Sequence, residues 1–145
     1  MTFLLVALLT PHLTSQENAI QALSEFKKNK QIPHVIERHV LTALSHYPEL
    51  KDTRIRFVFT RRLQRSVMAA RPVAGSLLRR KQKRTYSILI NPVFKLKHRV
   101  DPVRQIPDSV LIGWIGHELG HIMDYERRST WGVAAFGVSF GLSKK

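Results

Sequence analysis

The stretch "GWIGHELGHIMDY", residues 113–125, holds two histidines four positions apart, with a glutamate directly after the first. On a helical wheel His117, Glu118 and His121 fall within an arc of about 100°. The apolar residues of the same helix occupy the neighbouring arc, from about 160° to 280°. A helix that separates an apolar face from a histidine edge suits a site beside a core. The apolar face consists of Leu111, Ile112, Ile115, Leu119, Ile122 and Met123.

This helix should begin at Pro107 and Asp108 and run to about Arg128. Asp108 suits an N-cap or a first-turn anion, and the two arginines at the other end suit a helix C-terminus. Glycines inside a helix cost about 1 kcal/mol each relative to alanine. A glycine edge next to the histidines therefore predicts the close approach of another backbone or a ligand, or close packing on a sheet. The glycines are Gly113, Gly116 and Gly120.

The spacing of the motif is typical of a zinc site. Residues at i and i+4 lie one turn apart, so His117 and His121 can converge on one tetrahedral ion at about 2.0–2.1 Å. Glu118 can then take a proton from a zinc-bound water, whose pKa the metal lowers toward about 7. The bare H-E-x-x-H pattern arises by chance in about one sequence of this composition in a hundred. The separate core face therefore adds support to the zinc interpretation.

"HELGH" resembles the motif of the zincin metallopeptidases, and the longer stretch is similar to small bacterial gluzincin-type zinc peptidases with H-E-L-x-H-x-x-D-Y. The resemblance is sharpest over residues 109–126 and extends loosely through "YSILIN" and "SHYPEL". It implies a zincin-like fold, zinc as cofactor and peptide-bond hydrolysis, with His117 and His121 as ligands and Glu118 as general base. It also implies that the strand before the helix, residues 85–90, binds substrate as an added strand. The residues concerned are Tyr86, Ser87, Ile88, Leu89 and Ile90.

The third zinc ligand is not evident. The metzincin pattern requires Gly and His where this chain has Asp124 and Arg127, so that branch does not fit. The gluzincin pattern takes an acidic ligand from a later helix, and no Asp, Glu or His follows Glu126. We favour a chain truncated at its C-terminus. The alternatives are an upstream ligand, with His98 or Asp101 as candidates, and a vestigial site.

Two further residues of the helix are candidates for supporting roles. Asp124 lies one turn past His121 and could orient an imidazole through a hydrogen bond, and the alternative is an i,i+4 pair with Arg128. Tyr125 lies on the histidine side and could donate a hydrogen bond to an oxyanion. A tyrosine packed in the core is the alternative for that position.

The rest of the chain predicts an α+β domain with N-terminal helices, a small antiparallel or mixed sheet and the active-site helix. Residues 15–30 and 33–47 carry apolar side chains at helical spacing. Residues 53–61 and 84–92 alternate apolar and polar side chains, as strands do. The length of 145 residues suits one domain, which we assign to residues 17–145. Its apolar tail predicts a second, less regular helix or a packed loop.

The N-terminus carries an apolar run of seven residues, 3–9, too short to span a bilayer. The run fits the hydrophobic region of a signal peptide, although no positive residue precedes it. We expect residues 1–16 to be a signal peptide and the protein to be exported to the periplasm or beyond the cell. The alternative is a short buried helix in a cytoplasmic protein. The chain has no cysteine, which excludes disulfides and cysteine-ligated zinc.

The net charge of +14 predicts attraction to anionic surfaces. Residues 61–84 hold nine of the cations and form either a long basic loop or a basic hairpin. A second hypothesis is therefore a basic protein that binds nucleic acid or anionic lipid through this segment. Few aromatic residues interleave with the cations, and export would make anionic lipid the better partner. A third is a pseudo-peptidase that keeps zinc for stability.

Overall fold

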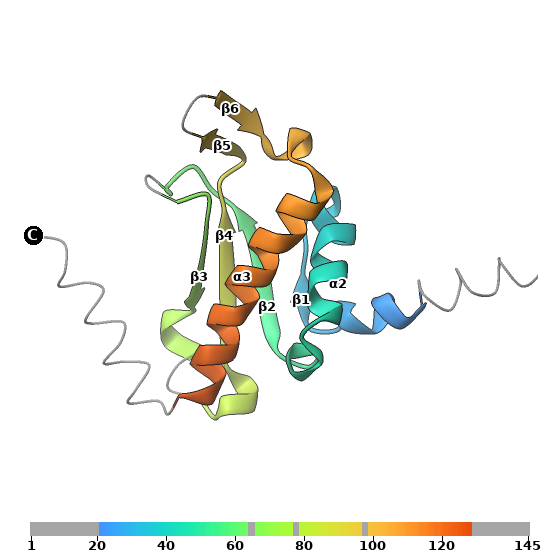
Figure 1. Ribbon diagram of the computed structural model, residues 1–145. Helices are drawn as coiled ribbons and strands as arrows, with labels where there is room; N and C mark the ends of the chain where they lie inside the picture. Colours follow the sequence, from blue (N-terminus) through green and yellow to red (C-terminus); the bar gives the residue numbers. More distant parts are fainter. Residues whose placement is uncertain (1–20, 64–65, 77–78, 97–98, 129–145) are drawn as a thin grey trace, which may run out of the picture.

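Figure 1 shows the computed structural model, which describes residues 21–63, 66–76, 79–96 and 99–128. These residues form an α+β fold in which two helices cover one face of a small mixed sheet and a two-stranded hairpin lies at one end. The α+β prediction is confirmed at this level. Within the described ranges, no helix is both long and apolar enough to cross a bilayer. The predicted signal peptide and the apolar tail after residue 128 lie outside them.

The two strands predicted from alternation form the centre of the sheet. Strand β2 (Arg54–Phe59) and strand β4 (Thr85–Ile90) pair in parallel along their whole length. Every second side chain is buried on the face that the helices cover, and the others are exposed or half-buried. The period of two in the sequence therefore reports one buried face. The buried set comprises Ile55, Phe57, Tyr86, Ile88 and Ile90.

Two shorter strands complete the sheet in the order β1-β2-β4-β3. Strand β1 (Lys30–Gln31) is parallel to β2, and strand β3 (Met68–Pro72) is antiparallel to β4. The prediction that residues 61–84 form either a long basic loop or a basic hairpin is therefore wrong. These residues contain the edge strand β3 and two 3-10 helices, η4 (Ala74–Ser76) and η5 (Lys81–Lys83). Strand β3 was not predicted because its short apolar run lies between arginines.

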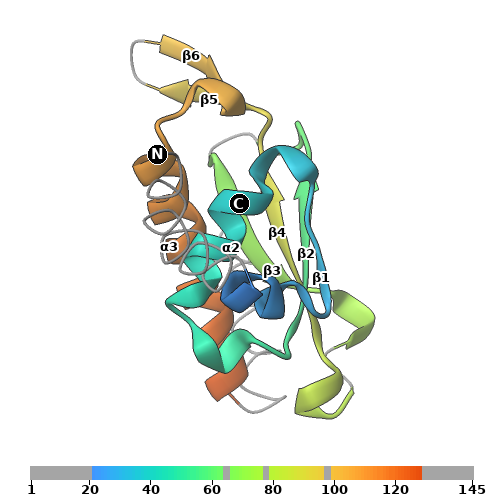
Figure 2. The same cartoon turned by 90° about the vertical axis from the view of Figure 1, so that its right-hand side faces the viewer.

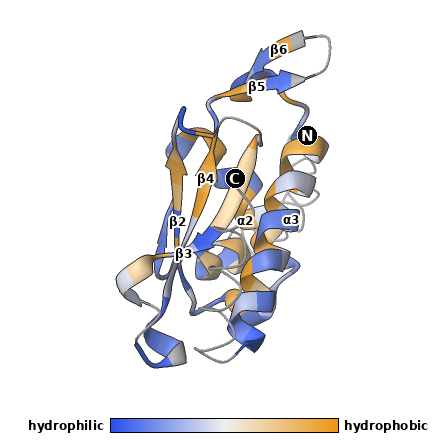
Figure 3. Ribbon diagram, turned by 90° about the vertical axis from the view of Figure 1, so that its left-hand side faces the viewer, coloured by the Kyte–Doolittle hydropathy of each residue, from blue (hydrophilic) through white to orange (hydrophobic). Residues whose placement is uncertain are grey.

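The two long helices lie side by side on one face of the sheet (Figure 2). The motif helix α3 (Asp108–Arg127) has the predicted limits, and its apolar side faces the sheet (Figure 3). The second predicted helix is α2 (Glu37–Ser45), which follows the 3-10 turn η2 (His34–Ile36). The first predicted helix, residues 15–30, ends before its predicted limit. Residues 21–24 are helical, and the 3-10 turn η1 (Glu25–Lys27) follows them. The core helix residues include Ile36, Val40, Leu44, Leu111, Ile115, Leu119 and Ile122.

A hairpin that the sequence analysis did not predict precedes α3. It consists of β5 (Val93–Leu96) and β6 (Arg99–Pro102) and leads through η6 (Val103–Gln105) into the helix. Phe94 is fully buried, and its ring packs edge to face on the ring of Trp114, with the ring centroids 5.1 Å apart. This aromatic contact fixes the hairpin against the first half of α3.

An ion pair and a hydrogen bond between charged or polar side chains join the starts of α2 and α3. Pro107 is the N-cap of α3, so Asp108 is the first helical residue and not the cap. Its carboxylate pairs with the guanidinium of Arg38 and lies 2.8 Å from Nε2 of His39. The hydrogen bonds from His39 and then Arg38 hold the pKa of Asp108 below its ordinary value. The acidic first turn thus serves both the helix N-terminus and the contact between helices.

Lys30 ties β1 to the turn that precedes β2. Its Nζ donates to the backbone carbonyls of Leu50, Lys51 and Thr53 at 3.0, 2.9 and 2.8 Å, and also to the carbonyl of Lys28. The 3-10 turn η3 (Pro48–Leu50) ends at these carbonyls. The ammonium group therefore satisfies several partly buried acceptors that no regular ladder reaches.

We predict that Lys30→Met lowers the free energy of unfolding by about 2 kcal/mol, because partly buried carbonyls lose a charged donor. Lys28→Met is the matched control, since Lys28 is exposed and its ion pair among the described residues is a surface contact with Asp52. That change should cost less than about 1 kcal/mol. Urea unfolding followed by circular dichroism measures both values, and equal losses in the two variants would contradict the anchoring role.

Candidate metal and active site

The two motif histidines come together on the exposed side of α3. Their Nε2 atoms lie 3.1 Å apart, and the ring planes are inclined by 82°. His117 and His121 both belong to the exposed residues of the helix, whereas the neighbouring Glu118 and Leu119 are buried. The helix therefore presents both imidazoles to solvent on one edge, as the spacing predicted.

The histidine pair fits a metal ion. Two nitrogens 3.1 Å apart can each lie about 2.0–2.1 Å from one ion, with an angle at the metal of about 100°, close to tetrahedral. Within the described ranges, no third Asp, Glu, His or Cys joins them in a group that could hold a metal. Asp101 lies on β6, opposite Phe94, away from this pair. His98 lies outside the described residues.

Glu118 points from α3 toward the edge strand β3. It is only 8% exposed, and its Oε2 accepts a hydrogen bond of 2.5 Å from the backbone N–H of Ala70. A buried carboxylate requires such a donor, because burial without one is costly. The side chain at position 70 is a small one, and α3 and β3 are in close contact. The bond thus sets the carboxylate between the histidine edge and the sheet.

The outer edge of β3 is the side that meets Glu118. Val67 accepts from the N–H of Asn91, and Val73 donates to the carbonyl of Thr85, so these two residues bond toward β4. Backbone groups alternate along an antiparallel strand, so those of Met68, Ala70 and Pro72 point outward. The bond from Ala70 to Glu118 agrees with this alternation.

The predicted substrate strand is not an edge. Residues 85–90 form β4, which pairs with β2 on one side and with β3 on the other. An added strand needs free N–H and C=O groups along one edge, so the prediction that β4 takes the substrate is wrong. Chain order misled it, because β3 precedes β4 in sequence but lies outside it in the sheet. The edge strand next to the site is β3.

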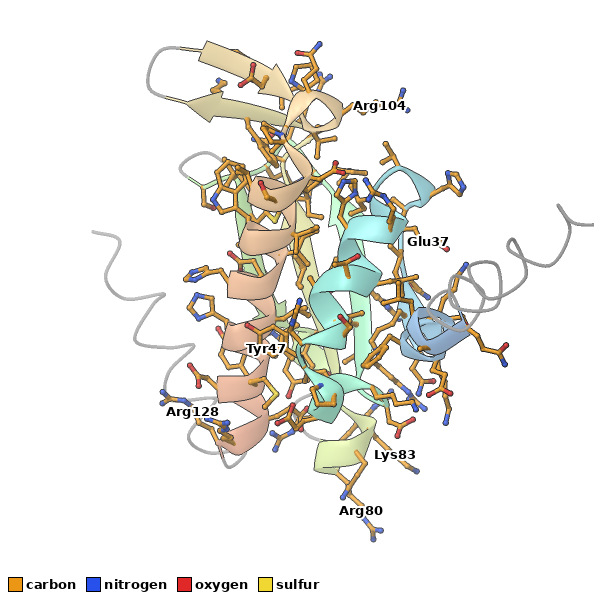
Figure 4. The ribbon with its side chains drawn as sticks, turned by 45° about the vertical axis from the view of Figure 1, so that its right-hand side comes forward. Glu37, Tyr47, Arg80, Lys83, Arg104 and Arg128 are labelled. Carbon is orange, nitrogen blue, oxygen red and sulfur yellow. The ribbon has the colours of Figure 1, made fainter. Side chains whose placement is uncertain are left out.

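A groove of about 530 Å³ lies between the histidine edge and the end of α2. Tyr47, which Figure 4 shows beside α3, donates its hydroxyl hydrogen to the carbonyl of Gly116 at 2.8 Å. A Cβ at Gly116 or Gly120 would meet this ring at 3.7–4.0 Å, and one at Gly113 would meet nothing within 4 Å. Gly116 and Gly120 thus face a side chain, and Gly113 does not. The groove residues are His46, Tyr47, Glu49, His117, Gly120, His121, Met123, Asp124 and Arg127.

The two supporting candidates lie in different surroundings. Asp124 is exposed and lines the groove beside His121, but within the described residues no hydrogen bond joins its carboxylate to either imidazole. Tyr125 is half-buried and stacks on the ring of Tyr86, with centroids 6.2 Å apart. Burial, and then the Glu118 carboxylate, raise the pKa of Tyr125, so its phenol stays protonated at neutral pH. The stacking favours the packing role for Tyr125.

Sequence reasoning missed Tyr47 and Ala70, the two residues that position the helix and its glutamate. The glycines of α3 signalled a close neighbour but could not identify it. Ala70 contributes only its backbone N–H, which no side-chain pattern reveals. The one available signal was the apolar "VMAA" run, residues 67–70, within the arginines.

Comparisons of the chain with protein-family models, with curated proteins and with solved structures found no match. The function is therefore argued from the arrangement of His117, Glu118 and His121 and from the resemblance of their motif.

We predict that Glu118→Gln changes the free energy of unfolding by less than about 1 kcal/mol, because the amide oxygen can still accept from Ala70. Glu118→Ala should lower it by about 2 kcal/mol, because it leaves that N–H unsatisfied and opens a small cavity. Urea unfolding at pH 7 measures the difference. If the two variants were equally stable, the hydrogen bond would not be what Glu118 contributes to the fold.

Proposed function

We propose that the protein is a zinc metallopeptidase, with His117 and His121 as metal ligands and Glu118 as general base. The observation that carries the proposal is the convergence of two exposed imidazole nitrogens, 3.1 Å apart, beside a buried carboxylate. Zinc, when bound, supplies a Lewis acid and lowers the pKa of a coordinated water toward about 7. Zinc would need a third ligand besides the two histidines, which His98, a water molecule or another chain would supply.

A zincin-like fold is part of this proposal. It is supported by the mixed sheet, by the antiparallel edge strand and by the packing of the motif helix across them. A supporting role for Asp124, which would orient an imidazole once a metal is bound, is proposed with it. The stacking of Tyr125 on Tyr86 favours packing over the role of oxyanion donor.

Glu118 would move the proton in this reaction. One carboxylate oxygen is held by the N–H of Ala70, which leaves the other available to the attacking water. The carboxylate accepts a proton from that water and then passes it to the leaving amine. Its fixed position reduces the reorganisation that the reaction needs.

The substrate peptide would bind as a strand added to the outer edge of β3. The outward carbonyls of Met68 and Ala70 can accept from the peptide's N–H groups. Pro72 has no N–H to offer, and the N–H of Ala70 is already bound to Glu118. We therefore expect β3 to act mainly as an acceptor, so that the peptide's own N–H groups carry most of the pairing.

The first test is zinc content of the purified chain by elemental analysis. We expect about one zinc per wild-type chain and none in His117→Ala or His121→Ala, because one imidazole cannot hold the ion. His34→Ala is the control, since that exposed histidine lies on η2 and not on α3. Glu118→Gln should keep the metal and lose hydrolysis of a fluorogenic peptide by at least about 100-fold.

The outcomes separate the hypotheses. A wild-type chain that takes up no zinc contradicts the metal site. Hydrolysis that survives Glu118→Gln contradicts the role of the general base. Zinc that binds and stabilises the fold while no peptide is cut favours the pseudo-peptidase.

A further inference from the structure

The net positive charge of this protein comes from one part of the chain. Residues 53–100 contain 14 Lys and Arg and no Asp or Glu. The remaining 97 residues contain 10 Lys and Arg and 10 Asp and Glu, so they carry no net charge. The whole excess of +14 therefore belongs to the sheet and hairpin segment and not to the helices.

The helices cover one face of the sheet (Figures 1 and 2). The strand register places part of this charge on the other face. Arg56 of β2 and Arg71 of β3 are both in register with Ser87 of β4, so both side chains leave the sheet on this face. Arg71 lies on the edge strand, and its guanidinium also acts electrostatically on Tyr125 of α3. Arg54 lies two residues before Arg56, beside Thr85. All three arginines are exposed.

A pocket of about 360 Å³ opens on the same side. Arg54, Arg56 and Arg79 line it together with Asn29, Lys30, Gln31 and Thr85. Clustered guanidinium groups are a usual means by which proteins bind phosphate. Below, "the arginine face" means Arg54, Arg56, Arg71 and Arg79.

The arginine face is not neutralised within the described residues. Their ion pairs join Lys27, Lys28, Arg38, His39 and Lys51 to carboxylates of the helices and turns. None of these pairs includes a member of the arginine face. Its guanidinium groups are therefore available to an external anion.

We propose that the arginine face docks on a bilayer of anionic phospholipids. The next row of side chains on this face is apolar and consists of Val58, Leu89 and Ala69, which are in register across β2, β4 and β3. Val58 is 41% exposed. A basic surface beside an apolar row matches the boundary between head groups and acyl chains. The sheet positions on this face carry no aromatic side chain on which nucleic-acid bases could stack.

This orientation leaves the helices on the side away from the bilayer (Figure 2). His117 and His121 belong to α3 and therefore lie on that side. The proposal does not depend on zinc or on peptide hydrolysis.

The test is co-sedimentation of the full chain with phosphatidylcholine vesicles that contain about 30% phosphatidylserine, at about 0.1 M salt. Arg54→Gln with Arg56→Gln should weaken binding by about 10- to 30-fold. Arg71→Gln with Arg79→Gln tests the same face from other segments. Arg104→Gln with Arg127→Gln is the control, because it removes the same charge from η6 and α3 and should weaken binding by less than about 3-fold.

Three results would overturn the proposal. These are equal binding to pure phosphatidylcholine, an equal loss in the control pair, and tighter binding to single-stranded RNA at the same phosphate concentration. Thermal unfolding checks that every variant is folded. Since the substituted arginines are exposed, their melting temperatures should stay close to that of the wild type.

Discussion

The burial of the apolar face of α3 against the sheet is the contact on which the rest of the structure depends. Leu111, Ile115, Leu119 and Ile122 are almost completely buried. Together they contribute about 6–12 kcal/mol, at about 1.5–3 kcal/mol each. That exceeds the roughly 3 kcal/mol that three helix glycines cost. Packing therefore fixes the rotation of α3, and the same rotation directs both histidines outward.

The rotation also brings one charged group inside. Glu118 lies at the boundary of the apolar face, where a carboxylate must find a donor or leave the core. The outward N–H of Ala70 is that donor, and it exists because β3 is an edge strand. The site and the sheet edge are thereby linked through one hydrogen bond. A peptide that pairs with β3 would lie directly beside the general base that we propose.

Charge is also unevenly distributed over the molecule. The ion pairs of the described residues join side chains of the helices and turns, among them the contact of Asp108 with Arg38 and His39 that joins the two helix starts. The sheet face opposite the helices holds cations and hydroxyls without acidic residues. Self-repulsion among these cations opposes folding, so their concentration on one face favours an external anion as partner.

Local patterns in the sequence were enough to predict the limits of α3, its core face, the convergence of His117 and His121, and strands β2 and β4. Each depends on a period of about 3.6 or 2 residues that a short stretch displays. The sheet order, the edge position of β3, and the partners of Glu118 and Gly116 became known from the fold. These depend on contacts between segments far apart in the chain, and several are made by backbone atoms. For the same reason β4 was wrongly predicted as the substrate strand: alternation identifies a strand, but hydrogen bonds with neighbours determine whether an edge is free.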